Sequence, residues 1–265
     1  MAHRVVRRHP VAAPVALAVL AVLCLPLVVM IGASFNPGTE QVFPPRGLSL
    51  RWYANILNRD GFLRAFELSV ALGLLSALVS VAAGTLAALA LVRYRFPGRD
   101  ALLTLLLSPL IVPGVVIGMA FLVSFAALGV FRSFPSLFVL HVVITLPYAV
   151  RVVVGSLTRV KVSLEEAARV LGAPPWRAFL TVTLPVIRTG MVAAAIFAFV
   201  TSFDNFTASQ FLVWDRSTLP VEIYSYVRTE NDPTVAALCA LLVAGVSVVV
   251  VVLDRYVGIE AFTGR

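Results

Sequence analysis

Residues 68–92 have the sequence LSVALGLLSALVSVAAGTLAALALV, and none of these side chains carries a charge. A helix needs about 20 apolar residues to cross a hydrocarbon layer roughly 30 Å thick. In lipid the backbone N–H and C=O groups have no water to bond, so a spanning segment must pair them internally, as a helix does. This stretch therefore predicts a transmembrane helix, and with it an all-α integral membrane protein.

The rest of the chain repeats this pattern. Of its 265 residues, 60% are hydrophobic and 13% are charged, and the apolar residues are gathered into long blocks. Six blocks are long enough to span a bilayer, and we expect a single transmembrane domain over residues 1–265. The predicted spans are residues 11–33, 68–92, 101–124, 134–154, 189–213 and 234–253. The first exceeds the apolar core of a signal peptide, so we interpret it as an uncleaved span.

Lys and Arg are distributed unevenly over the loops that these spans define. If both termini are cytoplasmic, the inner segments hold 14 of the 21 Lys and Arg residues and the outer segments hold seven. An excess of basic residues in short loops marks the cytoplasmic side of a membrane protein. We therefore expect an N-in, C-in topology. The net charge of +8 follows from this topology, and we expect no nucleic acid as a partner.

Small side chains recur every four residues along the second predicted span, at Ser76, Ser80, Gly84 and Ala88. A stripe of small residues lets a neighbouring helix approach closely. Helices of the same chain or of a second copy could both use such a stripe, and packing within the chain is the favoured interpretation.

Two prolines, Pro109 and Pro113, interrupt the third predicted span. Proline removes a backbone donor and clashes with the preceding turn of a helix. Spanning helices tolerate such breaks where neighbouring groups or a cavity satisfy the freed carbonyls. The prolines are therefore compatible with a simple kink and equally with a shaped solute pathway.

A polar, amphipathic insert separates the fourth and fifth predicted spans on the expected cytoplasmic side. Ser163 and Glu166 have the spacing of a capping box, which predicts the start of a short helix. Gly172 can end that helix, because glycine adopts the left-handed conformation of a helix stop without steric cost. A second helical segment should begin at Pro175, and we expect Pro185 to end it before the fifth span.

One face of the first of these short helices is apolar. Four residues at helical spacing form this narrow stripe: Leu164, Ala167, Ala168 and Leu171. Glu165 and Arg169 point elsewhere. An amphipathic helix of this kind can lie on the membrane surface, and it can equally dock on a partner in water.

The order Glu166-Ala-Ala168, Gly172, Val182 and Leu184-Pro185 resembles the EAA signature of permease subunits of binding-protein-dependent ABC importers. Val182 stands where that family usually has isoleucine, which is a conservative change. The resemblance implies that residues 156–187 are a cytoplasmic coupling segment, whose helix sits in a groove on the ATP-binding subunit. The residues it assigns to this contact are Leu164, Glu166, Ala167, Ala168, Leu171, Gly172, Leu184 and Pro185.

Further stretches, at residues 48–57, 90–99 and 219–238, are similar to permease subunits of spermidine/putrescine importers. This resemblance implies the type I ABC importer permease fold, with six spans in the bacterial cytoplasmic (inner) membrane. It also implies three partners: a second homologous permease subunit, two copies of an ABC ATPase and an extracytoplasmic solute-binding protein. The expected solute is a polyamine or a related small cationic amine. Ferric iron, thiamine, phosphonate and opines are the alternatives.

The chain has no residues suited to ATP hydrolysis. No G-x-x-x-x-G-K-[ST] phosphate loop occurs in it, and this loop is what cradles the nucleotide in such ATPases. No nucleophile, acid/base pair or metal-ligand cluster stands out either. We therefore expect a non-catalytic subunit without a cofactor or metal of its own, with ATP and Mg²⁺ bound by the partner ATPase.

Three polar residues, Ser202, Asp204 and Asn205, lie inside the predicted fifth span. A carboxylate at the centre of a spanning helix costs about 2.5–3.5 kcal/mol, so Asp204 should face water or a partner. One hypothesis is that the three residues line the solute pathway and that Asp204 favours a cation. A structural hydrogen bond or a shallow interfacial position explains them equally well. His141, in the fourth span, is expected to be a core histidine with satisfied hydrogen bonds.

A different class of protein, an ion-coupled secondary transporter, would use Asp204 and the broken third span as its coupling site. Such a carrier has no need for a short capped helix at the spacing found between spans four and five. The insert therefore favours the ATP-driven importer.

Overall fold

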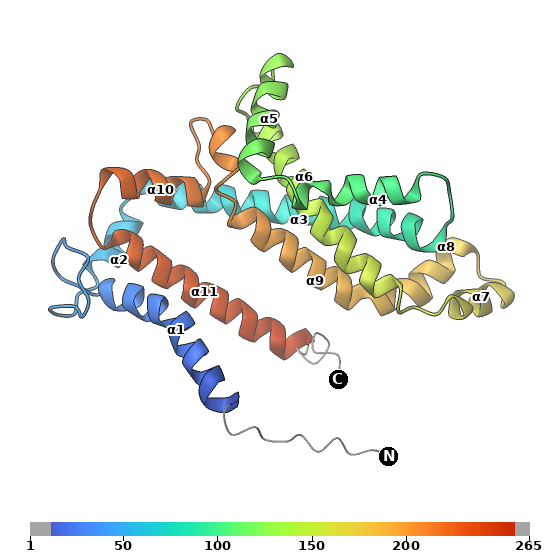
Figure 1. Cartoon of the computed structure of the whole chain (residues 1–265), viewed down its shortest axis with the longest axis horizontal. Coiled ribbons are helices and arrows are strands. Elements are labelled where there is room, and N and C mark those ends of the chain that lie inside the picture. Colours follow the sequence, from blue (N-terminus) through green and yellow to red (C-terminus); the bar gives the residue numbers. More distant parts are fainter. Residues whose placement is uncertain (1–11, 258–265) are drawn as a thin grey trace. The chain divides into compact units, whose positions relative to one another are not determined.

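The computed structural model describes residues 12–257, and all regular structure within them is helical (Figure 1). The fold class predicted from the sequence, all-α, is confirmed. The elements in chain order are α1 (Ala12–Ala33), α2 (Arg51–Leu57), α3 (Asp60–Arg93), α4 (Arg99–Leu107), η1 (Ser108–Leu110), α5 (Gly114–Ala127), α6 (Phe134–Leu157), α7 (Val162–Val170), α8 (Pro175–Ala178), η2 (Phe179–Thr183), α9 (Leu184–Phe203), η3 (Ser209–Phe211), α10 (Leu219–Thr229) and α11 (Thr234–Val257).

The described chain forms two compact units. One contains residues 12–60 and 225–257, and we call it the terminal unit; the other contains residues 61–224, and we call it the central unit. The predicted start of the first span at residue 11, and the basic residues nearest the two termini, lie outside the described residues.

Four helical stretches among the described residues are long and apolar enough to cross a membrane: Ala13–Ala33, Asp60–Arg93, Phe134–Leu157 and Pro175–Phe203. A fifth is present if the bent pair Arg99–Leu110 and Gly114–Ala127 counts as one span. The sixth predicted segment forms α11, in which Thr234–Val249 is a shorter apolar stretch. The helices thus follow the predicted segments, and the six-span count stays a prediction.

The third predicted span, residues 101–124, is not one straight helix. It consists of α4 with η1 and of α5, and the two parts are bent by 101°. Pro109 lies in η1, and Pro113 is the N-cap of α5 with an extended ψ of 134°. The residue before a proline is disfavoured in the helical region, so Pro113 ends one helix and starts the next. The break is far larger than a simple kink.

The fifth predicted span, residues 189–213, also differs from the structure. Its helix, α9, begins at Leu184 and ends at Phe203. Asn205 then accepts hydrogen bonds through its side-chain oxygen from the backbone N–H groups of Ala208 and Ser209, both at 3.2 Å. Side chains of this type compete with the helix for backbone donors. The chain therefore leaves α9 at residue 204 and enters a turn before η3.

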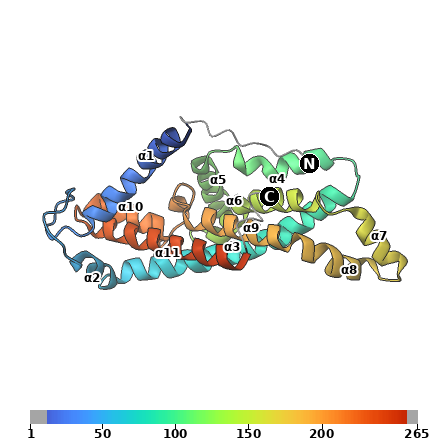
Figure 2. The same ribbon diagram turned by 90° about the horizontal axis from the view of Figure 1, so that it is seen from below.

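The core of the central unit is built on α6, which packs most extensively on α9. Both views show these two helices running side by side (Figures 1 and 2). One apolar cluster lies at one end of the unit and contains Leu72, Ile117, Leu137, Leu140, Ile144, Ala208 and Leu212. A second contains Ala88, Ala149, Val153, Leu157, Val160, Ile187 and Ala194. The first cluster packs α3, α5 and α6 against the segment around η3, and the second packs α3, α6 and α9 against one another.

The stripe of small residues on α3 packs within the chain, as predicted. Ser80 shares a 2.7 Å hydrogen bond with the hydroxyl of Thr145 on α6. A Cβ added at Gly84 would lie 2.9 Å from the Cβ of Ala149, so the two helices touch at this glycine. Only a glycine allows so close an approach of the backbones.

The terminal unit has its own packing. In it α11 contacts both α1 and α2. Trp52 is buried and donates its ring N–H to the carbonyl of Asn36 at 2.7 Å, which fixes α2 against the loop that follows α1. The most apolar 18-residue window of α1 has no buried residue, although Ala33 at the end of the helix is buried. This exposure is expected of a helix that faces lipid or a second membrane subunit.

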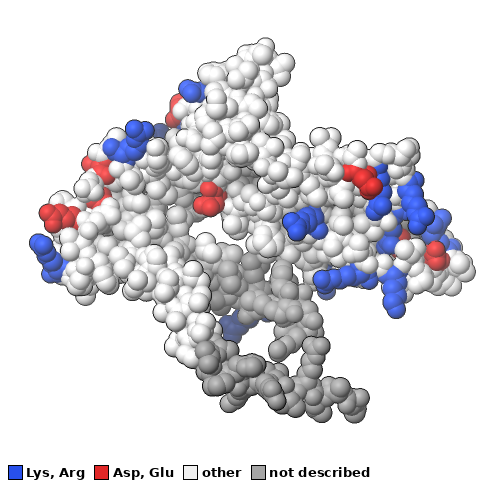
Figure 3. Space-filling view, viewed as in Figure 1, with Lys and Arg blue, Asp and Glu red and all other residues white. Residues whose placement is uncertain are grey.

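Charged side chains gather at one end of the central unit, over α7, α8 and the turn between α3 and α4 (Figure 3). Beside this end, the described surface in the same view is mostly uncharged and carries a few separate charged side chains. A mostly uncharged surface next to an end rich in charged side chains is the distribution expected of helices that cross a bilayer and end at its surface.

Candidate functional site

The predicted coupling helix exists as α7, but its start differs from the prediction. Lys161 is the N-cap, with an extended ψ of 124°, and no side chain caps the helix. Ser163 is already inside the first turn, so the predicted capping box between Ser163 and Glu166 is wrong. The sequence spacing was right for such a box, but the chain turns into the helix two residues earlier.

The predicted end of α7 is confirmed. Gly172 has a φ of +90°, the left-handed conformation that ordinary residues avoid. Two backbone bonds close the stop: Gly172 N–H donates to the carbonyl of Arg169 at 3.0 Å, and Ala173 N–H donates to that of Ala168 at 3.1 Å. This is the hydrogen-bond pattern of a glycine-terminated helix.

The apolar stripe of α7 faces outward. Leu164 is 50% exposed and Leu171 is 89% exposed, while Glu166 and Ala167 are also exposed and Ala168 is half-buried. Trp176, on α8 beside it, is exposed as well. Large apolar side chains that stand in water among basic residues mark a surface that a partner covers. The stripe therefore has the position of a docking face.

Glu165 turns the other way, toward the bundle. One of its carboxylate oxygens accepts a hydrogen bond from the Arg93 guanidinium at 2.9 Å, and the same oxygen accepts one from the Thr183 hydroxyl. The sequence assigned Glu165 to no function, and it indicated Arg93 only as part of a basic loop. These residues lie 72 and 18 positions from Glu165, and no local spacing signals their contact.

The second half of the coupling segment is continuous with the membrane helix. α8 begins after Pro174, as predicted, but Pro185 does not end the helical stretch. Phe179–Thr183 form a π-helical turn that leads directly into α9, where Pro185 occupies the first turn. In a π-helix each backbone hydrogen bond joins residues five positions apart instead of four. The turn is therefore wider than an α-helical turn and accommodates the proline. Leu184 is partly buried and Pro185 is exposed.

A buried polar network lies at the opposite end of α9. His141 is fully buried and satisfies both ring nitrogens, with the Ser202 hydroxyl at 2.7 Å and the Ser209 hydroxyl at 2.9 Å. Ser209 also donates to the side-chain oxygen of Asn205 at 3.1 Å. The prediction of a satisfied core histidine is confirmed. The network ties α6, the last turn of α9 and η3 together.

Of the three polar residues predicted to line a pathway, one is exposed in the structure. Ser202 is buried in the network with His141, and Asn205 is half-buried with its oxygen used by η3. Asp204 follows the last residue of α9 and its side chain is exposed. The carboxylate thus lies outside the helix rather than within it, which removes the burial cost that a mid-helix position would carry.

Aromatic rings flank Asp204 along the chain. Phe203 stacks on Phe199 with ring centroids 5.6 Å apart, and it meets Phe66 edge to face at 6.1 Å. On the other side Phe206 lies 4.7 Å from the ring of Tyr224. A carboxylate with aromatic residues close to it in the chain is a combination that suits an organic cation.

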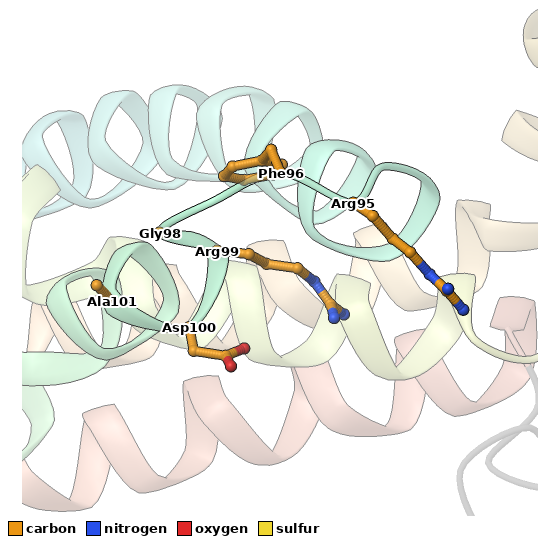
Figure 4. Close-up of a pocket in the computed structure, with 6 residues that line it drawn as sticks. All are labelled: Arg95, Phe96, Gly98, Arg99, Asp100 and Ala101. Atoms are coloured by element: carbon orange, nitrogen blue, oxygen red, sulfur yellow. The ribbon is translucent and has the colours of Figure 1, made fainter.

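Two shallow pockets occur elsewhere. The first, of about 470 Å³, lies at the turn between α3 and α4 and is lined by Arg95, Phe96, Gly98, Arg99, Asp100 and Ala101. Arg95 and Arg99 extend on the same side of this turn (Figure 4). Arg99 uses its Nε–H to bond the carbonyl of Leu91 at 2.7 Å, which holds the turn against the end of α3. This pocket is the basic loop predicted to mark the cytoplasmic side.

The second pocket, of about 340 Å³, lies in the terminal unit and includes Trp52, Arg59 and Asp232. Burial alone would raise the pKa of Asp232, but hydrogen bonds from Thr234 and Tyr226 and the nearby charge of Arg59 hold it below its usual value. Burial and the same carboxylate raise the pKa of Tyr226. Both effects keep Asp232 charged and Tyr226 protonated, so they fix the loop before α11.

No group of three or more His, Cys, Asp or Glu side chains comes together to hold a metal within the described residues. The two cysteines, Cys24 and Cys239, are unpaired in the structure. The arrangement that remains is a short helix with an exposed apolar stripe, α7, at one end of α9 and an exposed carboxylate, Asp204, at the other.

Comparison with known proteins shows which family the chain resembles over most of its length. Residues 80–258 match the sequence profile of the family described as "Binding-protein-dependent transport system inner membrane component". The putrescine transport system permease protein PotI of Escherichia coli K12 is 31% identical over 235 residues, which cover 86% of this chain and 83% of that protein. The spermidine/putrescine transport system permease protein PotC of the same organism is 30% identical over 249 residues and 94% of both chains.

A solved structure shows the same fold. It is a bacterial alginate ABC transporter in complex with an alginate pentasaccharide-bound periplasmic protein, and one of its chains superposes with a TM-score of 0.69. The superposition covers 94% of this chain and 93% of that one, at 17% sequence identity. At this identity the likeness concerns the fold alone.

Proposed function

Because the chain belongs to the family of binding-protein-dependent transport system inner membrane components, we propose that it forms the pathway of an importer for small cationic amines of the putrescine and spermidine kind. The coarser statement holds without the solute: the chain is the permease subunit of an ABC importer and resides in the inner membrane. We also propose that α7 docks on an ATPase, that the solute is a polyamine, and that the importer contains further protein partners.

The exposed carboxylate of Asp204 is the observation that carries the solute class. It lies just past the end of α9, between Phe203 and Phe206, each of which pairs with another ring. A protonated amine gains from a carboxylate and from aromatic faces together. A fold similar to that of an alginate transporter does not fix the solute. The choice therefore rests on this chemistry and on the two polyamine relatives.

In this proposal Asp204 is the only one of the three predicted residues that meets the solute. Ser202 and Asn205 hold the turn behind it through His141 and Ser209. This is a narrower role than the sequence indicated, because the Ser202 side chain is only 3% exposed.

The partners follow from the docking face and from the family. A separate ABC ATPase, in two copies, binds ATP and Mg²⁺ and covers the exposed face of α7. The residues of this face are Leu164, Glu166, Ala167, Ala168 and Leu171, and the helix ends at Gly172. Leu184 and Pro185 pass its motion into α9. A second homologous permease subunit completes the pathway, and an extracytoplasmic binding protein delivers the solute to the outer side. The docking helix lies on the cytoplasmic side, in an N-in, C-in chain.

The experiment compares Asp204→Asn with Asp215→Asn in the complete importer, reconstituted in liposomes with its binding protein and ATPase. Asp215 is also exposed and follows η3 in the same region, so it controls for loss of charge alone. Losing one ion pair of about 1.4 kcal/mol corresponds to a tenfold change in affinity. We expect Asp204→Asn to reduce the uptake of labelled putrescine about tenfold and Asp215→Asn to leave it within twofold.

Assembly must be measured beside uptake. Asp204→Asn should co-purify with its partners in normal amounts, because the side chain is exposed. Unchanged putrescine uptake by this variant would contradict the assigned role of Asp204. Uptake of a neutral or anionic solute in preference to amines by the wild-type complex would contradict the solute class.

A further inference from the structure

Glu165 joins three elements through one carboxylate oxygen. It belongs to α7; its donors are Arg93, in the last turn of α3, and Thr183, the last residue of the π-helical turn before α9. The adjacent residue, Glu166, faces solvent. Neighbouring glutamates on one short helix therefore point in different directions, one toward the bundle and one toward the face where a partner docks.

The contact is shielded from water. The side chain of Arg93 is 12% exposed and that of Glu165 is 22% exposed, while Thr183 is fully buried. Exposed ion pairs contribute little, but a shielded pair leaves an uncompensated charge when one partner is removed. The Nε–H of Arg93 is buried and has no acceptor among the described residues. Among the described residues, Glu165 therefore supplies the negative charge that pairs with the Arg93 guanidinium.

Thr183 connects this contact to the membrane. Its hydroxyl has Glu165 as its hydrogen-bond partner within the described residues. The π-helical turn that contains it runs without a break into α9, whose 20 residues end beside Asp204. A helix of this length is a rod of about 30 Å. Short π-helical turns are rare in proteins, and those that occur often lie at functional sites.

We propose that Glu165 is a positioning residue that transmits the movement of α7 to α3, through Arg93, and to α9, through Thr183. The inference rests on the proposed function, because it needs an ATPase that moves α7. The helix backbone alone would let α7 pivot on the loop around Gly172 and Pro174. The Arg93–Glu165–Thr183 link prevents this pivot, so a displacement of α7 must carry both membrane helices with it.

The test uses the complete importer in liposomes and measures the ATP hydrolysed for each solute molecule imported. Thr183→Val removes the hydroxyl and keeps the shape of the side chain. The matched control is Thr181→Val in the same turn: Thr181 is exposed, and its hydroxyl donates to the carbonyl of Arg177 in its own helical stretch. Coupling between linked sites is ordinarily worth about 5- to 150-fold. We expect Thr183→Val to raise the ATP cost per solute about tenfold and Thr181→Val to leave it within twofold.

A second pair of variants separates transmission from folding. Glu165→Gln and Arg93→Gln should raise the ATP cost as Thr183→Val does, whereas Arg95→Gln, at an exposed arginine two residues after the end of α3, should not. The exchanged pair Arg93→Glu with Glu165→Arg restores opposite charges and should recover at least half of the coupling. In all of them the ATPase should co-purify as with the wild type. A normal ATP cost in the three single variants, or loss of ATPase binding in them, would overturn the inference.

A measurement without the ATPase keeps the link testable if the proposed function fails. A spin label at Arg169→Cys, with Cys24 and Cys239 replaced by serine, reports the motion of α7 in the permease alone. The label should be restrained in the parent protein and more mobile in Thr183→Val and Glu165→Gln. Equal mobility in all three would contradict the link. Failure of the wild-type permease to bind any ABC ATPase would contradict the proposed function alone.

Discussion

His141 shows how a single buried residue holds the end of α9. Both of its ring nitrogens are bonded to serine hydroxyls, from Ser202 on one side and Ser209 on the other. A buried hydroxyl that loses its partner costs about 1–3 kcal/mol. We expect His141→Leu to lower the free energy of unfolding by about 1–3 kcal/mol, because it leaves the buried Ser202 hydroxyl without its partner, whereas Ser209 keeps its bond to Asn205. Thermal unfolding of the detergent-solubilised protein measures this change.

The control replaces the whole network. Removing all polar partners together can be nearly neutral, since no donor is then left unpaired. The triple variant His141→Leu, Ser202→Ala and Ser209→Ala should therefore be more stable than His141→Leu alone. If the single variant unfolds at the wild-type temperature, the network does not hold this end of the helix.

The sequence predicted that His141 is satisfied but not by which residues. Its partners lie 61 and 68 positions away, and two serines among many carry no signal of their own. Asp204 shows the same limit from the other side. Its charge marked it as unusual within an apolar stretch. Its exposure, however, depends on where α9 ends: the helix stops at Phe203, and the Asn205 side chain holds the turn that follows. Side-chain competition for backbone donors decides such ends, and it is weakly encoded in hydrophobic pattern.

At the scale of an element, α7 is a short helix whose outward stripe awaits a partner. Leu171 is 89% exposed, so a charge placed there does not disturb the core of this chain. In a desolvated groove of the ATPase the same charge would be buried without a counter-ion. We expect Leu171→Glu to reduce co-purification of the ATPase at least tenfold while the permease keeps its thermal stability.

Val170→Glu is the matched control for that variant. Val170 is equally exposed, and it lies about 110° around the helix from the centre of the stripe. It should retain most of the ATPase binding. Equal loss in both variants would mean that the helix docks through no particular face, and no loss in either would mean that α7 is not the docking element.

Elements were predictable where one physical signal decides them. Long uncharged stretches predicted the spanning helices, and Gly172 predicted the stop of α7, because few residues tolerate a positive φ. The prolines predicted breaks in the helices, but the sequence does not indicate the size of a break. Pro109 and Pro113 lie at a bend of 101°. Pro185, in contrast, fits inside a continuous helical stretch after a π-helical turn. Tertiary packing chooses between these outcomes.

At the scale of the whole molecule, the membrane topology depends on the bent pair α4 and α5. If the pair crosses the bilayer, three crossings separate the α3–α4 turn from the loop after η3, since α6 and the α8–α9 stretch supply the other two. Those two loops then lie on opposite sides. If the pair instead enters and leaves on one side, only two crossings remain and the loops share a side.

Single cysteines at these loops distinguish the two topologies. Arg95→Cys lies in the α3–α4 turn and Asp215→Cys follows η3, and both side chains are exposed; Cys24 and Cys239 are replaced by serine in the background. A membrane-impermeant maleimide should label Asp215→Cys in intact spheroplasts and Arg95→Cys only in inverted vesicles, because basic loops stay in the cytoplasm. Both should react in detergent. Labelling of both from the same side would make the pair a re-entrant loop, and labelling with the two sides exchanged would refute the N-in, C-in orientation.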